Sequence, residues 1–423
     1  MRLRLGQVYD SLHACDLEHL FVGELIIPDE QLVPEFLRTA VTYLFDKHPV
    51  LSAKFHHFSD GWQMLLGDCD HDSVTAALSI VAFESEATRL AQIHRLIRTV
   101  QAQGLQARPL LRYVLFESTA TGEQRLLILF HHLICDGISS RILWRDLSHA
   151  YLAAAQGEPQ RAKRCDSYQH LALELEQRHL HCAVQVMQEF APRGLLDKLC
   201  QEHRGQTLRS QLVTHTALLE PEALVELSRQ ARQWQVTVAD LLLGHWICAL
   251  SRLQPAGSVG LMMWVSPHFV GQWDTCVTDL VGSVSFPIPV QFDLCRCTLR
   301  EHVQKAAAEL GVALDSAQAY AVRYFSGAPG AAHATLPAVG FNFVNAQRPS
   351  RRLLGYRLAP EALDIPRAPE QLAELALSFE AEVYEQSMKL TVHAAPGLER
   401  QLAIHAWTQA LFEGLRTVEH AAC

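Results

Sequence analysis

The chain has 423 residues, of which 49% are hydrophobic and 19% charged, and its formal net charge is −9. This composition is typical of a globular protein and excludes a disordered chain. The negative charge gives no support for nucleic-acid binding, which usually requires a basic stripe. The length exceeds that of one ordinary hydrophobic core, so we expect two domains of about 200 residues each.

Targeting signals and cysteine usage indicate the cellular compartment of the protein. No apolar run approaches the ~20 residues of a membrane-spanning helix, and Met1–Gln7 lacks the apolar core of a signal peptide. The 11 cysteines include no C-x-x-C pair, which favours reduced thiols. We therefore expect a cytoplasmic protein without a membrane span, and we expect it to be a monomer.

Three groups of possible metal ligands do not meet the requirements of a known site. One acidic segment lacks the glycine and the distal glutamate of a calcium loop. It consists of Asp68, Asp70, His71 and Asp72. His179 and His181 are too close in sequence to share a helical face. Cys295 and Cys297 precede a predicted helix but have no histidine partner at zinc-site spacing, so we expect no metal.

Hydrophobic periodicity and turn residues predict alternating helices and strands in the first part of the chain. Helices are expected at 29–46 and 84–103, and strands at 78–81, 109–116 and 125–130. Pro49 ends the first helix, because proline disfavours helical backbone before it. Asp60-Gly61, between Phe58 and Trp62, predicts a hairpin.

The strand at 125–130 ends in two histidines, and this junction is the most informative stretch of the chain. Neighbouring side chains in a strand point to opposite faces, so His131 and His132 cannot both face one space. Asp136 is placed to fix the turn that follows, and Gly137 allows a sharp turn or a close approach. We expect the arrangement to hold one imidazole rigidly at the end of a strand.

The rest of the chain again mixes helices and strands. A helix at 137–155 is followed by a basic, polar linker around 161–164. Helices are then expected at 168–190, 220–234, 238–252, 299–310 and 398–415. Strands are expected at 211–218, 261–265, 339–344, 375–383 and 388–393. No repeat of about 30 residues, as in successive βαβ units, is present.

The pattern H-H-x-x-x-D-G from His131 to Gly137 resembles the signature of the condensation-domain superfamily, which also holds the chloramphenicol-acetyltransferase-like and polyketide-associated acyltransferases. Weaker similarities follow in the family's order, at Gln7, at His48–Leu51 and at Val281-Gly282. The late motifs of modular peptide-synthetase condensation domains are not recognisable. We therefore identify the chain as a freestanding, divergent member of this superfamily.

The resemblance implies an α/β fold with mixed sheets. Two chloramphenicol-acetyltransferase-like lobes, residues 1–165 and 166–423, would form a V-shaped pseudo-dimer around a central tunnel. An acyl thioester would enter from one mouth and the nucleophile from the other.

The resemblance also implies roles for the motif. His132 matches the catalytic position and would act as general base, a task suited to an imidazole. His131 would support the motif from the core. Asp136 would form a structural ion pair, in which His268 could replace the usual arginine, or the partner could lie elsewhere. The amide of Gly137, at a helix start, is a candidate oxyanion donor.

Further residues are candidates for contact with the substrate. The tunnel candidates are Ser139, Asn342 and Asn345, although an asparagine at a strand end also forms turns. A basic cluster would meet phosphate or an acidic carrier, unless it is simply a solvated loop. It consists of Arg348, Arg351 and Arg352. Asp315-Ser316 lacks the flanking residues of a phosphopantetheine attachment site, so the donor would arrive separately.

We therefore expect an acyltransferase in natural-product biosynthesis. It would condense an acyl, peptidyl or polyketide thioester with a small-molecule amine or alcohol, and it would bind no cofactor of its own. The donor would be carried on the phosphopantetheine of a carrier protein, or on coenzyme A. Two alternatives are a coenzyme-A-dependent O-acyltransferase of a lipid or alcohol, and a non-catalytic domain that recruits a carrier protein. Silent relatives usually lose motif residues, whereas here all are intact.

Overall fold

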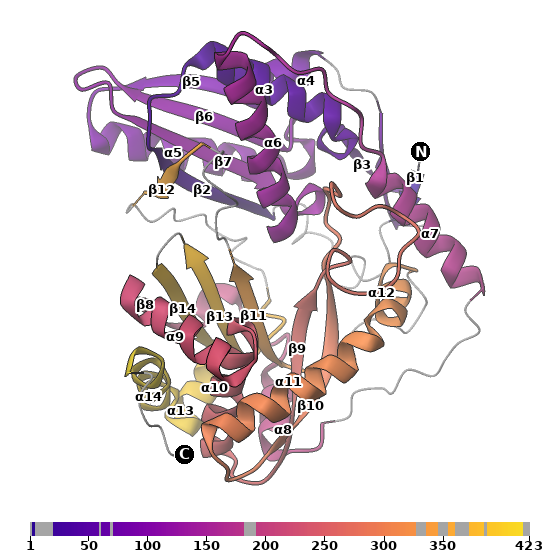
Figure 1. The fold of residues 1–423 in the computed structure, drawn as a ribbon, viewed down its shortest axis with the longest axis vertical. Helices are drawn as coiled ribbons and strands as arrows, with labels where there is room; N and C mark the ends of the chain where they lie inside the picture. Colours follow the sequence, from indigo (N-terminus) through magenta and orange to yellow (C-terminus); the bar gives the residue numbers. More distant parts are fainter. Residues whose placement is uncertain are drawn as a thin grey trace.

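The computed structural model describes residues 2–4, 20–58, 61–67, 71–181, 192–326, 336–345, 354–359, 372–384 and 387–417. They form two lobes of mixed helices and sheets, one above the other in Figure 1. This architecture confirms the fold class expected from the sequence.

The first lobe is built around a five-stranded sheet with the order β12-β2-β7-β6-β5. Its strands are β2 (Phe21–Pro28), β5 (Leu78–Phe83), β6 (Leu111–Ser118) and β7 (Gln124–His131). Its helices are α3 (Pro34–Lys47), α4 (His71–Ala77), α5 (Glu86–Gln103) and α6 (Gly137–Ala155). One face of the sheet packs in a core with α3 and α6, and the other packs against Ile93 and Ile97 of α5.

A small sheet completes this lobe, with the order β1-β4-β3. Its strands are β1 (Arg2–Arg4), β3 (Lys54–Phe58) and β4 (Gly61–Leu65). Phe58 pairs with Gly61, which confirms the predicted hairpin. Short 3-10 helices connect the larger elements at η1 (Pro49–Ser52), η2 (Gly104–Gln106) and η3 (His132–Ile134).

The second lobe holds a six-stranded sheet with the order β10-β9-β11-β13-β14-β8. Its strands are β8 (Val213–Leu219), β9 (Gly257–Val265), β10 (Phe286–Leu294), β11 (Val339–Asn345), β13 (Leu377–Tyr384) and β14 (Ser387–Ala394). Its helices are α7 (Ser167–His181), α8 (Leu195–His203), η4 (Arg209–Gln211), α9 (Pro221–Trp234), α10 (Val238–Leu253), α11 (Leu299–Asp315), α12 (Ala317–Ser326), α13 (Pro396–Leu402) and α14 (Ile404–Thr417).

Helix α10 is the central helix of this lobe. Thr237 and Asp240 form a capping box that starts it. It is apolar on every side and buried along most of its length, as expected for a helix inside a core. Trp246 stacks on Phe379 of β13 and contacts Trp407 of α14. Helices therefore cover one face of the sheet.

Strand β12 (Tyr356–Leu358) joins the lobes. It pairs antiparallel with β2, so the second half of the chain adds a strand to the sheet of the first lobe (Figure 1). The division of the chain at residue 165 stays a prediction. Strand β12 comes after residue 165 in the sequence but pairs within the sheet of the first lobe.

Most predicted elements match the structure, and a few do not. The helix predicted at 137–155 has the bounds of α6, and the strands predicted at 375–383 and 388–393 pair as β13 and β14. The closing helix predicted at 398–415 is wrong as one element. It is divided into α13 and α14 at Ala403, whose φ of 49° interrupts the helical backbone. Residues 182–190 of the helix predicted at 168–190 lie outside the described residues.

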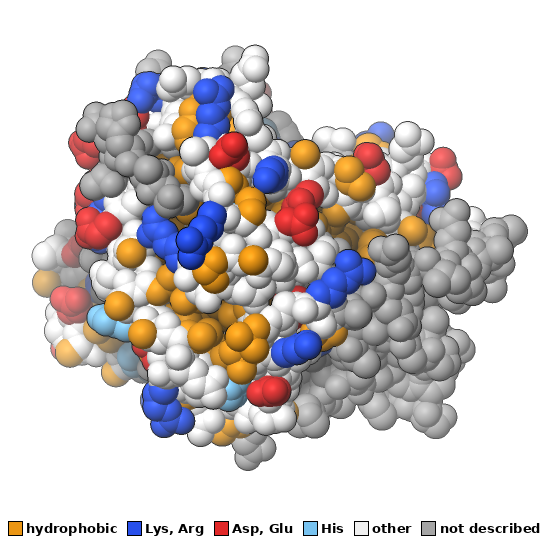
Figure 2. Space-filling view, turned by 90° about the horizontal axis from the view of Figure 1, so that it is seen from below, with side chains coloured by type: hydrophobic (Ala, Val, Ile, Leu, Met, Phe, Trp, Pro, Cys, Tyr) orange, Lys and Arg blue, Asp and Glu red, His pale blue; other side chains and the backbone are white. Residues whose placement is uncertain are grey.

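Three further observations bear on the expectations from composition. Cys248 is disulfide-bonded, which corrects the expectation of reduced thiols throughout. In the described segments, no single helix is long and apolar enough to cross a membrane. The pair α9 and α10, bent by 94°, passes that test only together. On the face of the molecule in Figure 2, acidic and basic side chains are interspersed among hydrophobic ones.

Candidate active site

His131 is the last residue of β7, and it belongs to the core of the first lobe. Its side chain is fully buried, and its ring meets the ring of Phe21 edge-on with 4.8 Å between the centroids. Its Nδ1 accepts a hydrogen bond from the amide of Leu133 at 3.1 Å. A neutral ring that accepts at Nδ1 carries its proton on Nε2. The direction of this ring agrees with the alternation expected from the sequence.

His132 begins η3 and has a different environment. Its amide donates to the carbonyl of Leu20 at 2.8 Å, which fixes the backbone. The side chain is half-buried, and a hydrogen bond joins its ring to its own carbonyl. Burial lowers the pKa of His132, the charge of Arg209 lowers it further, and Asp136 partly offsets both. The ring is therefore neutral near pH 7 and able to accept a proton.

Asp136 caps α6 from inside the molecule. Its Oδ1 accepts hydrogen bonds from the amide and hydroxyl of Ser139 at 2.9 and 2.8 Å. Its Oδ2 accepts from the amide of Val284 at 3.2 Å and from the amide and hydroxyl of Ser285 at 3.0 and 2.8 Å. Val284 and Ser285 belong to the second lobe, so one buried carboxylate connects the two lobes.

The ion pair expected for Asp136 is not what the structure shows. Within the described residues its partners are neutral amides and hydroxyls, and no cation contacts it. The ring of His268, the expected substitute partner, lies instead 2.7 Å from the hydroxyl of Ser266 and 3.0 Å from the carbonyl of Leu280. The loop before β10 supplies enough backbone donors to satisfy the carboxylate without a basic side chain.

Ser139, a tunnel candidate from the sequence, forms a contact between the lobes. The side chain is fully buried. Its Oγ lies 2.8 Å from the carbonyl of Gly282 and accepts from the Gly282 amide at 3.0 Å. A Cβ at Gly282 would lie 2.0 Å from the ring of Tyr168, so a side chain there would force this contact apart.

Gly137 is the first residue of α6, and it is exposed. Among the described residues, no acceptor contacts its amide, as is usual for the first turn of a helix. The position of a Cβ on Gly137 would be 4.0 Å from Cγ1 of Val344. The end of β11, from the second lobe, therefore lies beside the motif.

The face of the second sheet that helices do not cover is polar. Phe341 and Phe379 are neighbours on the helix-covered face, so by alternation Asn342 lies beside Glu380 on the other face. The register of β13 and β14 adds further polar side chains to this face. They are Glu382, Lys389, Thr391 and His393. Because Val344 shares this face and lies beside Gly137, the face extends towards the motif.

A charged side chain outside the motif also affects the pKa of His132. Arg209, in η4, lowers the pKa of His132 and acts on Glu380 and Glu374. Burial raises the pKa of Glu380 and of Glu374, and Arg209 partly offsets this. Burial also raises the pKa of Glu24, on β2, and the charge of Glu382 adds to the effect. Arg209 thus acts both on His132 and on two carboxylates of the second lobe, and a carboxylate of β2 lies near Glu382.

These charged residues do not stand out in the sequence. Arg209 lies in a segment without periodicity, and Glu24 is one acidic residue in an apolar strand. The one usable signal is β13, where Glu380 and Glu382 alternate with Phe379, Ala381 and Val383. Such alternation is typical of a strand with one polar face, but it does not say what that face meets.

A second buried aspartate joins the lobes further along α6. Asp146 Oδ2 lies 2.8 Å from His48 Nε2 and 2.9 Å from Lys47 Nζ, and Arg145 contacts the other oxygen. Lys47 and Arg145 also reach Asp279 of the second lobe. Burial alone would raise the pKa of Asp146, but its partners hold it well below the usual range. Burial lowers the pKa of His48, so this ring is neutral near pH 7.

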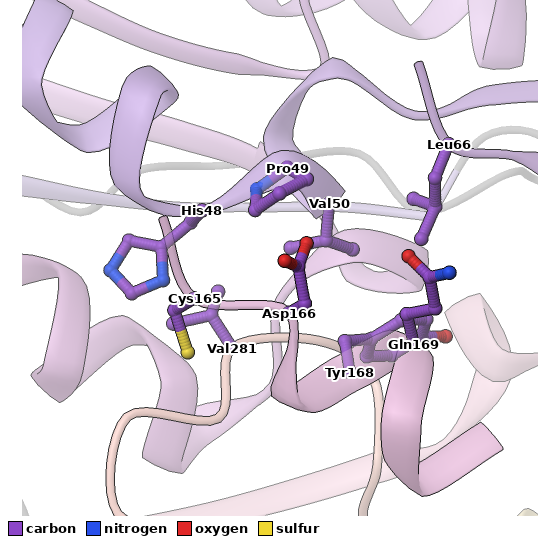
Figure 3. Close-up of a pocket in the computed structure, with 9 residues that line it drawn as sticks. All are labelled: His48, Pro49, Val50, Leu66, Cys165, Asp166, Tyr168, Gln169 and Val281. Atoms are coloured by element: carbon purple, nitrogen blue, oxygen red, sulfur yellow. The ribbon is translucent and has the colours of Figure 1, made fainter. Parts of the chain in front are cut away.

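His48 also lines a small pocket between the lobes (Figure 3). Cys165, Tyr168 and Val281 line it from the other side. His48 thus contacts Asp146 and borders this pocket, and its place follows from the helix end at Pro49.

Several predicted site residues fall outside the part of the chain that the structure describes. These are Gln7 and the donor-docking candidates, together with the side chain of Asn345. The docking candidates are Arg348, Arg351 and Arg352.

The sequence matches the family model described as "Condensation domain" over residues 18–266. The chain belongs to the condensation-domain family. One subunit of the linear gramicidin synthase of Brevibacillus parabrevis is 27% identical over 271 residues, which are 56% of this chain and 3% of that protein. Bacitracin synthase 1 of Bacillus licheniformis is 23% identical over 268 residues, 59% of this chain and 5% of that protein. The chain thus spans only a few per cent of these condensation-domain proteins.

Solved structures agree with this family at the level of the fold. The epimerization domain from the third module of tyrocidine synthetase B has a TM-score of 0.74 at 17% identity, over 99% of this chain and 98% of that one. The first condensation domain of the calcium-dependent antibiotic synthetase has a TM-score of 0.66 at 15% identity, over 98% and 96%. Both likenesses extend over the two lobes.

Proposed function

We propose that this condensation-domain chain is an acyltransferase of natural-product biosynthesis that joins a carrier-bound acyl, peptidyl or polyketide thioester to an amine or hydroxyl. The observation that carries the proposal is the state of His132, a neutral, half-buried imidazole held at the end of β7. The related synthases are named for gramicidin and bacitracin, which supports a role in peptide assembly.

In this proposal His132 accepts the proton of the attacking amine or hydroxyl. A C–N or C–O bond forms at the thioester carbonyl carbon, and the C–S bond breaks. The departing thiolate then takes the proton from the imidazolium. The amide of Gly137 would donate to the developing oxyanion, since it lies at a helix N-terminus. Asp136, a buried carboxylate near His132, would stabilise the imidazolium.

The donor is proposed to be the phosphopantetheine thioester of a carrier protein, with coenzyme A as the alternative carrier. An assay should offer the same acyl group on both carriers, with a panel of amines and alcohols, and detect products by mass spectrometry. We expect the carrier protein to be the better donor. Equal use of coenzyme A with alcohol acceptors only would favour the lipid or alcohol O-acyltransferase instead.

His132→Ala should reduce product formation by ~10²–10⁴-fold, the usual contribution of a positioned general base. The matched control is His149→Ala, which changes an exposed histidine on α6 outside the motif. Absence of product with every donor and acceptor, together with carrier binding, would indicate the non-catalytic recruitment domain. A folded His132→Ala protein with near-normal turnover would remove His132 from the mechanism.

A second candidate function is epimerisation at the Cα of an aminoacyl thioester. One observation favours it, namely that Glu374 and Glu380, with raised pKa, lie on the lobe opposite His132. Epimerisation requires two acid–base groups, and such carboxylates would provide the second. It would appear as deuterium uptake at Cα from heavy water in the absence of any acceptor, whereas an acyltransferase should show none.

A further inference from the structure

Two thiols and an imidazole meet where β10 ends and α11 begins. The Sγ atoms of Cys295 and Cys297 are 3.1 Å apart. Together with a ring nitrogen of His302 they form a group whose members all lie within 4.8 Å of one another. No histidine lies at zinc-site spacing in the sequence, but the structure brings His302 beside the two cysteines. His302 is in the first turns of α11, and the helix folds it back onto the segment before it.

His302 is a buried histidine whose ring is only partly hydrogen-bonded. Its side chain is only 1% exposed. A hydrogen bond joins the ring to the backbone of Cys295, while Nε2 has no hydrogen-bond partner among the described residues. A buried polar nitrogen without a partner is costly, and such groups often indicate a missing ligand. A hydrogen bond from one ring nitrogen to a backbone carbonyl is also how metal-binding histidines are commonly oriented.

Lys305 and a helix N-terminus lie near the two sulfurs and favour negative charge, whereas burial and the neighbouring Cys295 thiol raise the pKa of Cys297 to about 11. Lys305 Nζ lies 3.4 Å from Cys295 Sγ. Both cysteines precede the N-terminus of α11, where the helix dipole stabilises anions. The nearby carboxylate of Glu301 is already used, because its Oε2 accepts from the amide and hydroxyl of Thr298 at 2.8 Å. The group therefore offers three ligands, two of them sulfur.

We propose that Cys295, Cys297 and His302 bind a zinc ion through two thiolate sulfurs and one imidazole nitrogen, with water in the fourth position. Tetrahedral zinc places such ligand atoms about 3.5–3.8 Å apart, from its usual bond lengths. The present spacing of the sulfurs, 3.1 Å, reaches that geometry by small side-chain rotations. Thiolate and imidazole ligands select zinc over magnesium or calcium, which prefer oxygen.

This site would be structural and remote from the motif. Ser285, immediately before β10, contacts Asp136, whereas Cys295 follows the far end of the strand. Ten residues of extended chain span roughly 30 Å. A bound ion would therefore tie the end of β10 to the start of α11 without touching His132. The proposal does not depend on the acyltransferase assignment.

The test uses the full chain, reduced and stripped of metal with a chelator. Zinc is titrated in competition with a chromophoric chelator, and cobalt is used as a spectroscopic substitute. We expect one equivalent of zinc, a higher melting temperature with zinc, and a sulfur-to-cobalt charge-transfer band. Cys297→Ser and His302→Gln should each weaken binding by roughly 100-fold or more, since even outer-shell changes cost 10–100-fold.

The matched control is Cys276→Ser, which removes an exposed free thiol elsewhere in the second lobe and should leave binding unchanged. Because His302 is buried and its variant could misfold, Cys297→Ser carries the test alone if necessary. Substoichiometric binding, an unchanged affinity in Cys297→Ser, or oxidation of the two thiols at the same rate with and without zinc would each overturn the proposal.

Discussion

Asp136 and Asp146 lie at the start and in the middle of α6, and both are buried carboxylates that connect the lobes. Asp136 does so through neutral donors, the amides and hydroxyls of Ser139, Val284 and Ser285. Asp146 does so through cations, because Lys47 and Arg145 contact both it and Asp279 of the second lobe. The same helix thus joins the lobes by hydrogen bonds at one place and by ion pairs at another.

The difference between the two carboxylates affects the pKa of His132. The charge of Asp146 is balanced by its partners, so it holds the lobes together without acting on His132. No cation contacts Asp136 within the described residues, and its negative charge raises the pKa of His132 against the effect of burial. An ion pair at Asp136 would have cancelled that effect. The hydrogen-bonded arrangement therefore suits a residue that supports an imidazolium during proton transfer.

The largest loss of stability is expected for Asp136→Asn. The amide that replaces one carboxylate oxygen would point a donor at backbone donors that cannot turn away. Leaving such buried groups unpaired should lower the free energy of unfolding by about 3–5 kcal/mol. Urea unfolding measures this loss, and acyl transfer should fall with it. A fully stable but inactive variant would mean that Asp136 acts only on the chemistry.

A smaller loss is expected for Asp146→Asn. Lys47 and Arg145 have side chains that are 12% and 28% exposed, so both can regain water. His48 is neutral and can still hydrogen bond to an amide oxygen. We expect a loss of about 1–3 kcal/mol, because Lys47 and Arg145 keep Asp279 as a second carboxylate partner. If Asp146→Asn were the more damaging of the two, the contrast between the contacts would be wrong.

The smallest effect concerns the pH dependence of stability. The folded pKa of His48 is lowered, so below about pH 6.5 the unfolded chain takes up this proton first and stability falls. The folded pKa of Asp146 is also lowered, so its contribution is complete above about pH 4 and is lost only in stronger acid. His48→Gln should therefore lose less stability than the parent between pH 7 and 5. Thermal unfolding across this range checks it, and equal losses would contradict it.

The sequence predicts much of the first lobe and of the motif, because these depend on local pattern. The run that ends at His131, the turn at Asp136 and the helix α6 follow from alternation, capping and periodicity. Strand β12 has three residues and no periodic pattern, so only its pairing with β2 reveals it.

The rest of the site depends on which surfaces meet. Nothing near Arg209 in the sequence indicates that it acts on His132. His302 is not predicted as a partner of Cys295 because its spacing matches no common zinc motif. Arg209 is brought into place by tertiary packing, which local periodicity does not encode, and His302 by the first turn of α11.

His132 is the group that takes the proton in the proposed mechanism. The most direct measurement is the single-turnover rate of acyl transfer against pH, for the parent chain and for His132→Ala. Because burial lowers the pKa of His132, the parent should keep its activity below pH ~6.5, the ordinary value for histidine, and lose it only in more acidic solution. His132→Ala should be slower by ~10²–10⁴-fold, with that acid limb gone and the melting temperature unchanged. An acid limb that persists in a folded His132→Ala protein, at a near-normal rate, would contradict the assignment.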